Sequence, residues 1–200
     1  PPIVSEDIIQ QYQLENKLIL GFVGFVREWH RLDRVLDAIA SHPKQNWHLF
    51  LVGDGPGREF LEKHAQHLGI TDRMTITGII SREKMPQYQS VFDLALQPDV
   101  TRYASPLKLF EYMALGKAIL APNMDNIKEI LKNEENGLLF SNEQEFKEKL
   151  IYLCENKRLR LELGEKAQLT IEKKKFYWVD NANKITDIIK YLKPQIQKND

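Results

Sequence analysis

The sequence has 200 residues, of which 42% are hydrophobic and 28% are charged, and both fractions are ordinary for a globular chain. Its 28 lysines and arginines balance 28 aspartates and glutamates, so no net positive field favours nucleic acid or an anionic membrane. The longest apolar run, 18–26, is too short to span a bilayer, and the single cysteine, Cys154, excludes an internal disulfide and suits a reducing compartment.

Residues 1–16 are polar and show no core periodicity, so we expect them to be irregular. Continuous apolar runs are typical of buried parallel strands and predict strands over 18–26, 47–52, 74–77, 94–96, 118–121 and 138–140. Helices are expected over 31–40, from 58 through Leu68, and over 81–90, 106–115 and 126–131. A helical tail from 142 onward should break near Asn156 and Phe176. This alternation predicts a doubly wound, Rossmann-like α/β fold, in which a parallel sheet has helices on both faces.

Ligands of such sheets bind beyond the carboxyl ends of the strands, so the loops that follow the strands are the candidate site. The first loop holds Arg27 and Arg31, which are suited to phosphate, and His30, which is suited to hydrogen bonding with a substrate. An ordinary surface loop often has the same composition.

The second loop, Gly53-Asp54-Gly55-Pro56-Gly57, is glycine-rich but lacks the dinucleotide spacing Gly-x-Gly-x-x-Gly, since Arg58 stands where the third glycine would be. We interpret this loop as a tight turn in which Asp54 caps the next helix, in preference to a phosphate cradle.

The stretch 105–117 predicts a short helix with Ser105 as N-cap, Pro106 at the first helical position and Gly116 just past the end. Lys108 stands where a capping box would place Glu or Gln, and a cation at the positive end of a helix costs roughly a few tenths of a kcal/mol. A bound anion would compensate for it. Glu111 follows one turn later, so a cation for phosphate lies beside a carboxylate for hydroxyls, as a sugar nucleotide requires. The alternative is an ordinary amphipathic helix with a surface lysine and glutamate.

Several short motifs occur together in one order and spacing: Phe22-Val23-Gly24 with Trp29-His30, then Leu51-Val52-Gly53-Asp54-Gly55-Pro56, then Thr77-Gly78, then the stretch 105–117. In this combination the chain resembles the donor-binding half of retaining glycosyltransferases of family four, which have two facing doubly wound domains. The resemblance covers roughly residues 17–195 and includes Asn136-Gly137-Leu138-Leu139-Phe140 and a closing helix that begins at Tyr177-Trp178.

This resemblance implies that Lys108 and Arg27 act as the catalytic cations, which hold the donor pyrophosphate and stabilise the leaving diphosphate. The backbone amides of the stretch 105–109, which surrounds Lys108, would complete the phosphate site. The residues concerned are Ser105, Pro106, Leu107 and Leu109.

The resemblance also implies that Glu111 binds the nucleotide ribose and that the segment Gly78, Ile79 and Ile80 faces the base. Two positions depart from the family pattern. Tyr103 stands where the family has a first glutamate, with Asp99 nearby, and the usual Arg and Lys of the first loop fall at Phe25 and His30. Both departures concern the contacts of the donor sugar, so we place Tyr103 and His30 among the expected substrate-binding residues.

The implied organisation has three parts: a lead-in from a missing N-terminal domain (1–16), a nucleotide-sugar-binding domain (17–175) and a closing helix (176–200). The expected donor is a UDP- or GDP-sugar, and a sugar or lipid-linked acceptor would bind the missing domain, so this half alone should be inactive. We expect no metal, no further cofactor, no nucleic acid and no transmembrane segment. The expected location is cytoplasmic, or peripheral at the inner membrane face for the full-length protein. Two alternatives are a sugar-nucleotide epimerase of the same fold and a non-catalytic nucleotide-binding domain.

Overall fold

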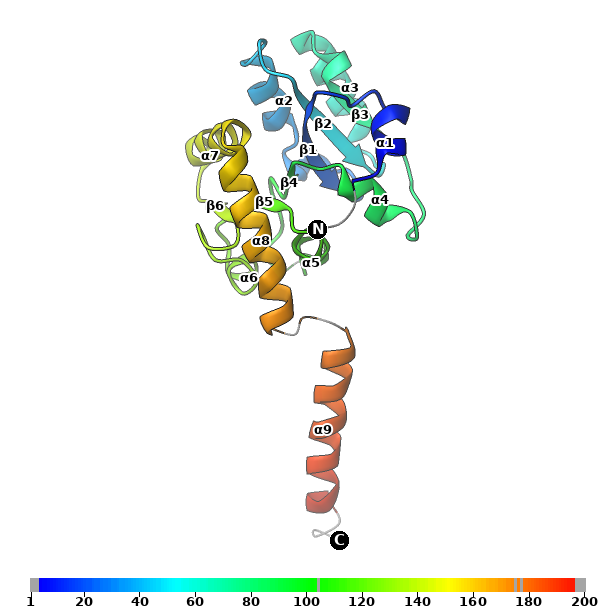
Figure 1. Cartoon of the computed structure of the whole chain (residues 1–200), viewed down its shortest axis with the longest axis vertical. Coiled ribbons are helices and arrows are strands. Elements are labelled where there is room, and N and C mark those ends of the chain that lie inside the picture. Colours follow the sequence, from blue (N-terminus) through cyan, green and yellow to red (C-terminus); the bar gives the residue numbers. More distant parts are fainter. Residues whose placement is uncertain (1–3, 104, 175, 177, 197–200) are drawn as a thin grey trace.

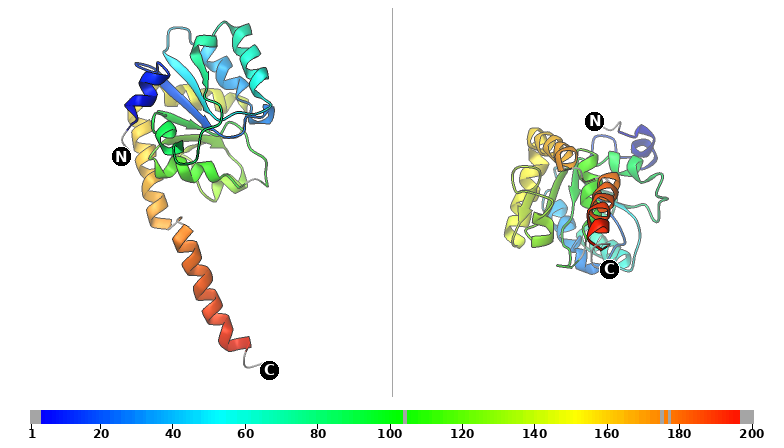
Figure 2. Two further views of the ribbon diagram at one scale, coloured as in Figure 1. Left: turned by 90° about the vertical axis from the view of Figure 1, so that its right-hand side faces the viewer. Right: turned by 90° about the horizontal axis from the view of Figure 1, so that it is seen from below.

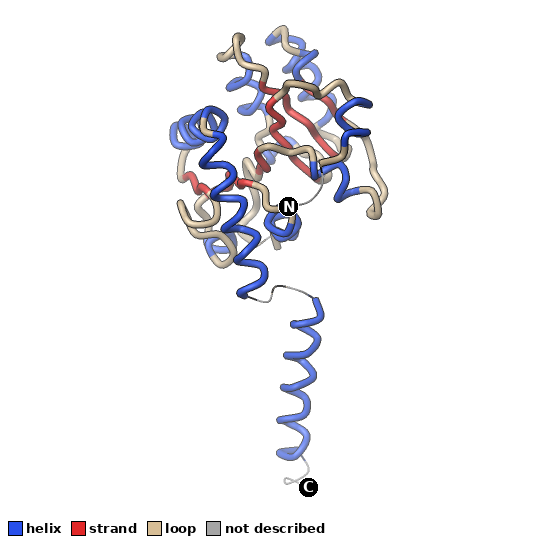
Figure 3. Tube along the Cα trace, in the orientation of Figure 1, coloured by secondary structure: helices blue, strands red, loops and turns tan. Residues whose placement is uncertain are grey.

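A computed structural model describes residues 4–103, 105–174, 176 and 178–196. Its centre is a six-stranded parallel sheet in the order β3-β2-β1-β4-β5-β6, which confirms the predicted doubly wound α/β fold (Figures 1 and 3). The strands are β1 (Leu18–Val23), β2 (Trp47–Val52), β3 (Met74–Ile76), β4 (Leu94–Leu96), β5 (Ala118–Pro122) and β6 (Leu138–Phe140).

Helices cover both faces of this sheet (Figures 1 and 2). They are α1 (Glu6–Gln11), α2 (Asp33–Ala40), α3 (Arg58–Leu68), α4 (Met85–Ser90), α5 (Leu107–Ala114), α6 (Asp125–Lys128), α7 (Glu143–Glu155), α8 (Lys157–Lys174) and α9 (Trp178–Ile196), with 3₁₀ turns at Glu28–His30 and Thr71–Arg73. The helices α2, α3 and α7 pack on one face and α1, α4, α5 and α6 on the other, while α8 contributes to both cores.

The alternation of side chains along each strand builds these two cores. In β1, Leu20 and Phe22 join the core under α2 and α3, whereas Ile19 and Val23 join the core under α4 and α5. Both sets are buried because helices cover both faces. This is why the strands read as continuous apolar runs rather than as alternating ones.

The prediction that residues 1–16 are irregular is wrong for the described part of this segment. Residues 6–11 form α1, in which Ile8 is buried, and Leu14 is buried just beyond it. The Tyr12 ring packs edge-on against Phe50, with 5.3 Å between ring centroids, so this segment covers part of one sheet face. A helix of six residues shows too little of the 3.6-residue period to be recognised from sequence.

The first strand ends at Val23, three residues earlier than predicted. Gly24 leaves the strand with φ of 141°, and the chain then turns outward at the carboxyl end of the sheet. The apolar run continues only because Val26 is buried against the second loop, whose Asp54 carbonyl accepts a hydrogen bond from the Val26 amide (2.8 Å).

The helical tail breaks where the sequence predicts, at Asn156 between α7 and α8 and near Phe176 before α9. Helix α9 extends away from the sheet (Figures 1 and 2), and Val179, Ile185 and Ile188 on it are exposed. Within the part of the chain that the structure describes, no helix combines the length and apolar character needed to cross a membrane. Tyr177 lies outside the described residues, and the three-part division of the chain remains a prediction.

Candidate functional site

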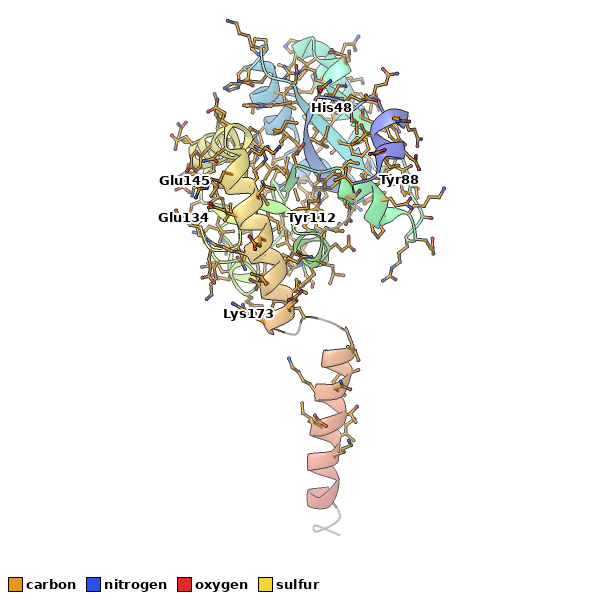
Figure 4. All side chains as sticks on the ribbon, viewed as in Figure 1. His48, Tyr88, Tyr112, Glu134, Glu145 and Lys173 are labelled. Atoms are coloured by element: carbon orange, nitrogen blue, oxygen red, sulfur yellow. The ribbon has the colours of Figure 1, made fainter. Side chains whose placement is uncertain are left out.

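The candidate site lies at the carboxyl ends of β1 and β4. These strands are neighbours in the sheet, but the chain leaves β1 towards β2 and leaves β4 towards β5, on opposite sides. Such a reversal of strand order opens a crevice between the two departing loops. Helix α5 begins there, and Tyr112 fixes it against β1, because its buried hydroxyl accepts a hydrogen bond from the Val23 amide (2.9 Å; Tyr112 is labelled in Figure 4).

Lys108 extends from the first turn of α5 over the end of β1. Its Nζ lies 3.9 Å from the centroid of the Phe22 ring, in cation–π geometry. A Cβ at Gly24 would lie 3.2 Å from this Nζ, so the glycine leaves the room that the ammonium occupies. Burial lowers the pKa of Lys108 to about 7, and the charge of Glu111 partly opposes that shift. The site therefore holds a largely desolvated cation that titrates near neutral pH.

His30 lies beside Lys108, against the same ring. It is buried, its ring centroid lies 4.8 Å from that of Phe22, and its Nδ1 accepts a hydrogen bond from the Arg27 amide (3.2 Å). Burial and the nearby Lys108 charge lower the pKa of His30 to about 4. The imidazole is consequently neutral at physiological pH, with its proton on Nε2, where it is a hydrogen-bond donor.

The two arginines expected to bind phosphate differ in their surroundings. Arg27 is exposed, and its guanidinium lies 5.0 Å from the Phe25 ring centroid. Arg31 pairs instead with Asp33 (3.3 Å) and lies 3.9 Å from Glu143. Of these two, only Arg27 remains without a carboxylate partner among the described residues.

A pocket of about 630 Å³ opens on the other side of the start of α5, next to Glu111. Its lining is mostly apolar, with Glu111, Arg82 and Gln89 as the polar groups, and comprises Val23, Ile80, Arg82, Met85, Pro86, Gln89, Leu107, Glu111, Ala114 and Leu115. This volume lies within the range of small-molecule pockets.

The segment that was expected to face a base contributes to this pocket through one residue. Ile80 lines it, whereas the Ile79 side chain is 88% exposed and Gly78 forms a turn with φ of 75°.

Glu111 is held by a residue that the sequence did not indicate. Gln89 on α4 is 2% exposed, and its Nε2 donates a hydrogen bond to Glu111 Oε2 (2.6 Å). The sequence signal is weak, because a glutamine in a short helix is ordinarily a surface residue.

The start of α5 differs from the prediction. The helix begins at Leu107, Pro106 occupies the N-cap position, and Ser105 makes no capping hydrogen bond through its side chain. The amides of Leu107 and Leu109 donate to the carbonyls of Ser105 and Pro106 (2.9 Å each). The expected row of free amides over 105–109 is therefore interrupted, and the lysine side chain is the main cationic group here. Gly116 ends the helix with φ of 62°, as predicted.

The glycine-rich loop 53–57 packs closely against the first loop. A Cβ at Gly53 would collide with the carbonyl oxygen of Gly24. The Gly57 amide donates to the Val26 carbonyl (3.0 Å), and Asp54 Oδ1 accepts from the Gly55 amide (2.8 Å). The loop is a tight turn, as predicted, but the predicted cap at Asp54 is wrong, because Gly57 is the N-cap of α3 and no side chain caps this helix.

The loop that follows β4 is anchored by Arg34, which sequence reasoning missed. Its buried guanidinium lies over the Phe140 and Phe146 rings and donates to the Pro98 carbonyl, and it lies 3.7 Å from an Asp99 carboxylate oxygen. Asp99 is thus engaged at the base of the loop. Tyr103, further along, is 91% exposed.

A second hollow, of about 620 Å³, lies at the opposite, amino-terminal edge of the sheet. Two cations that line it already serve the fold, because the half-buried Lys117 donates to the Ser90 carbonyl (2.6 Å) and the buried Arg160 donates to the Leu153 and Cys154 carbonyls (2.7 and 2.8 Å). These carbonyls end α4 and α7, where cations balance the helix dipole. Within the described ranges, no cluster of three or more His, Cys, Asp or Glu is arranged to hold a metal ion.

Comparison with known proteins gives one family. The family model "Glycosyl transferases group 1" matches residues 4–170. An uncharacterized glycosyltransferase of Methanocaldococcus jannaschii is 27% identical over 94% of this chain and 49% of its own length. A GDP-mannose-dependent phosphatidylinositol monomannoside mannosyltransferase of Mycobacterium tuberculosis is 29% identical over 46% of this chain and 25% of its own length.

Among solved structures, the Anabaena protein HepE in complex with UDP shares the fold, with a TM-score of 0.82 and 21% identity over 93% of this chain and 52% of that protein. The chain therefore spans about half the length, or less, of the proteins that it matches here.

Proposed function

Because the chain belongs to the glycosyl transferases group 1 family, we propose that it binds the nucleotide-sugar donor of a retaining glycosyltransferase. The observation that carries this proposal is the arrangement around the start of α5. A desolvated Lys108 lies on one side of it, and a mostly apolar pocket containing Glu111 lies on the other. The acceptor would bind the part of the protein that lies outside this sequence, as the coverage of about half of the relatives suggests.

The geometry suggests one position for each part of a nucleotide. The diphosphate lies near Lys108, with Arg27 and the Nε2–H of His30 as further donors on the same side of the crevice. The ribose hydroxyls bind the Glu111 carboxylate, and the base enters the apolar pocket beside Ile80. The UDP bound to HepE supports a uridine nucleotide, and the GDP-mannose dependence of the mycobacterial relative keeps a guanosine nucleotide as the other candidate.

The proposed chemistry follows from where charge develops. As the bond between the sugar and the donor diphosphate breaks, negative charge increases on the leaving diphosphate. A cation that is shielded from water interacts with that charge more strongly than an exposed cation does. Lys108 is half-buried and more desolvated than the exposed Arg27, and its contribution should therefore be larger in the transition state than in the bound donor.

The test is a titration of the chain with UDP, GDP and ADP, followed by chemical-shift mapping. We expect UDP or GDP to perturb the amides of 105–111 and of the pocket around Ile80, with weak affinity because half of the cleft lies outside the chain. Absence of any perturbation in these segments at millimolar nucleotide would refute the site. For the full-length protein, mass spectrometry of products from a panel of donors tests transfer itself. Product formation that requires an acceptor distinguishes transfer from epimerisation of the donor.

A further inference from the structure

Glu111 has a partner whose placement suggests a role beyond packing. Glu111 is exposed, whereas Gln89, which donates to its Oε2, is 2% exposed. An exposed carboxylate ordinarily samples several rotamers in water. Here a buried amide holds one of its oxygens at 2.6 Å, which leaves the other oxygen for a ligand.

The helix that carries Gln89 is itself fixed in place. The Ser90 carbonyl accepts a hydrogen bond from Lys117 Nζ (2.6 Å), and Ser90 Oγ accepts one from the Ser5 amide (3.0 Å). Tyr88, labelled in Figure 4, is buried and contacts Tyr12 edge-on. The Gln89 amide is therefore attached to a rigid part of the core, so it can determine where the Glu111 carboxylate lies.

We propose that Gln89 is a positioning residue, which fixes the Glu111 carboxylate in the orientation that binds the ribose hydroxyls of the donor. This inference rests on the proposed function, because it assigns the ribose to Glu111. Its physical basis is preorganisation: a side chain that is already ordered does not lose rotamer freedom when the ligand binds. Gln89 need not contact the nucleotide for this effect.

The test compares Gln89→Leu with Gln87→Leu, the same substitution at an exposed position of the same helix. Leucine has nearly the volume of glutamine and suits a buried site, but it cannot donate to Glu111. Each variant and the wild type are titrated with UDP and with 2′-deoxy-UDP. We expect the wild type to prefer UDP. Gln89→Leu should bind UDP about 3–10-fold more weakly and lose less affinity for 2′-deoxy-UDP, which offers Glu111 only the 3′-hydroxyl, so this preference should decrease. Gln87→Leu should keep it.

The readout is the ratio of the two affinities, which a general loss of structure would not change selectively. A Gln89→Leu variant that keeps the wild-type ratio would refute the role of Gln89 and leave the proposed site intact. A wild type that does not discriminate between the two nucleotides would instead refute the ribose assignment of Glu111 and the proposal with it. If the leucine variant does not fold, Gln89→Asn replaces it, since its amide is one methylene too short to reach Glu111, and the same loss of preference is expected.

Discussion

Replacing Lys108 with methionine should make the chain more stable and at the same time weaken its binding of the donor diphosphate. Burial lowers the pKa of Lys108 from its ordinary value of 10.5 to about 7. One pKa unit corresponds to 1.36 kcal/mol, so keeping this lysine charged in the fold costs roughly 3–5 kcal/mol relative to the unfolded chain. Methionine removes that cost and keeps an unbranched side chain, with its sulfur next to the Phe22 ring.

The gain should depend on pH in a defined direction. Between pH 7 and 10.5 the unfolded chain keeps a proton on Lys108 that the folded chain has released, so wild-type stability from this group rises with pH in that window. Lys108→Met should therefore raise the free energy of unfolding by about 1–3 kcal/mol at pH 6, because relaxation of the lysine towards water recovers part of the full cost. The advantage should shrink as the pH approaches 10.

The assay is urea unfolding at pH 6, 7.5 and 9, with Lys147→Met as the control, since Lys147 is an exposed lysine on α7. The same samples are titrated with UDP and uridine. UDP affinity should fall at least about tenfold in Lys108→Met, or 1.4 kcal/mol, while uridine affinity stays the same because uridine has no diphosphate. A variant that is less stable than the wild type at pH 6, or one that keeps full UDP affinity, would refute the reasoning.

Three further predictions concern the same site and its support. Glu111→Gln should weaken nucleotide binding by about tenfold or more with little change in melting temperature, because each charge-assisted bond to a ribose hydroxyl contributes roughly 1.5–3 kcal/mol. Calorimetry measures the affinity and thermal melts the stability, and unchanged affinity would mean that the carboxylate does not contact the ribose. UDP binding above pH 7 should be accompanied by protonation of Lys108, so UDP affinity should decrease as the pH rises through the pKa of this lysine. Calorimetry in two buffers with different ionisation enthalpies gives the number of protons taken up, and a value of zero at pH 8 would contradict the prediction. Gly53→Ala should destabilise the chain by about 2 kcal/mol or more, because a φ of 140° is strained for alanine and the added Cβ collides with the Gly24 carbonyl. Urea unfolding measures the loss, and wild-type stability in this variant would contradict the close approach of the two loops.

The fold was predictable because its strands are buried on both faces. Leu20 and Phe22 lie in one core while Ile19 and Val23 lie in the other, so β1 is apolar at every one of these positions. Such runs are recognisable without any tertiary information. Helix α1 was missed because its apolar pattern is too short to indicate a helix. Its helical form depends on tertiary packing, in which Ile8 joins the core on one face of the sheet.

The candidate site was predictable only where local chemistry is unusual. Lys108 stood out because a cation at the positive end of a helix is unfavourable without an anion. Gln89 and Arg34 did not, because nothing near them in sequence shows that tertiary packing buries their polar groups. The predicted cap at Ser105 was wrong because the Leu107 amide bonds back to the Ser105 carbonyl and the helix starts at Leu107, one residue later than predicted.

The unfavourable features of this fold are concentrated where the donor is proposed to bind. Lys108 is a cation at the wrong end of a helix, desolvated and without an ion pair among the described residues. His30 is held neutral beside it, because burial and the Lys108 charge lower its pKa to about 4. Gly53 has no side chain, which lets the two loops approach closely, and the absence of a side chain at Gly24 leaves space for the Lys108 ammonium. The desolvated charge of Lys108 is the feature that stability does not explain, and a diphosphate in the crevice would compensate for it. An unfavourable cation at this place is therefore better explained by ligand binding than by a contribution to the stability of the fold.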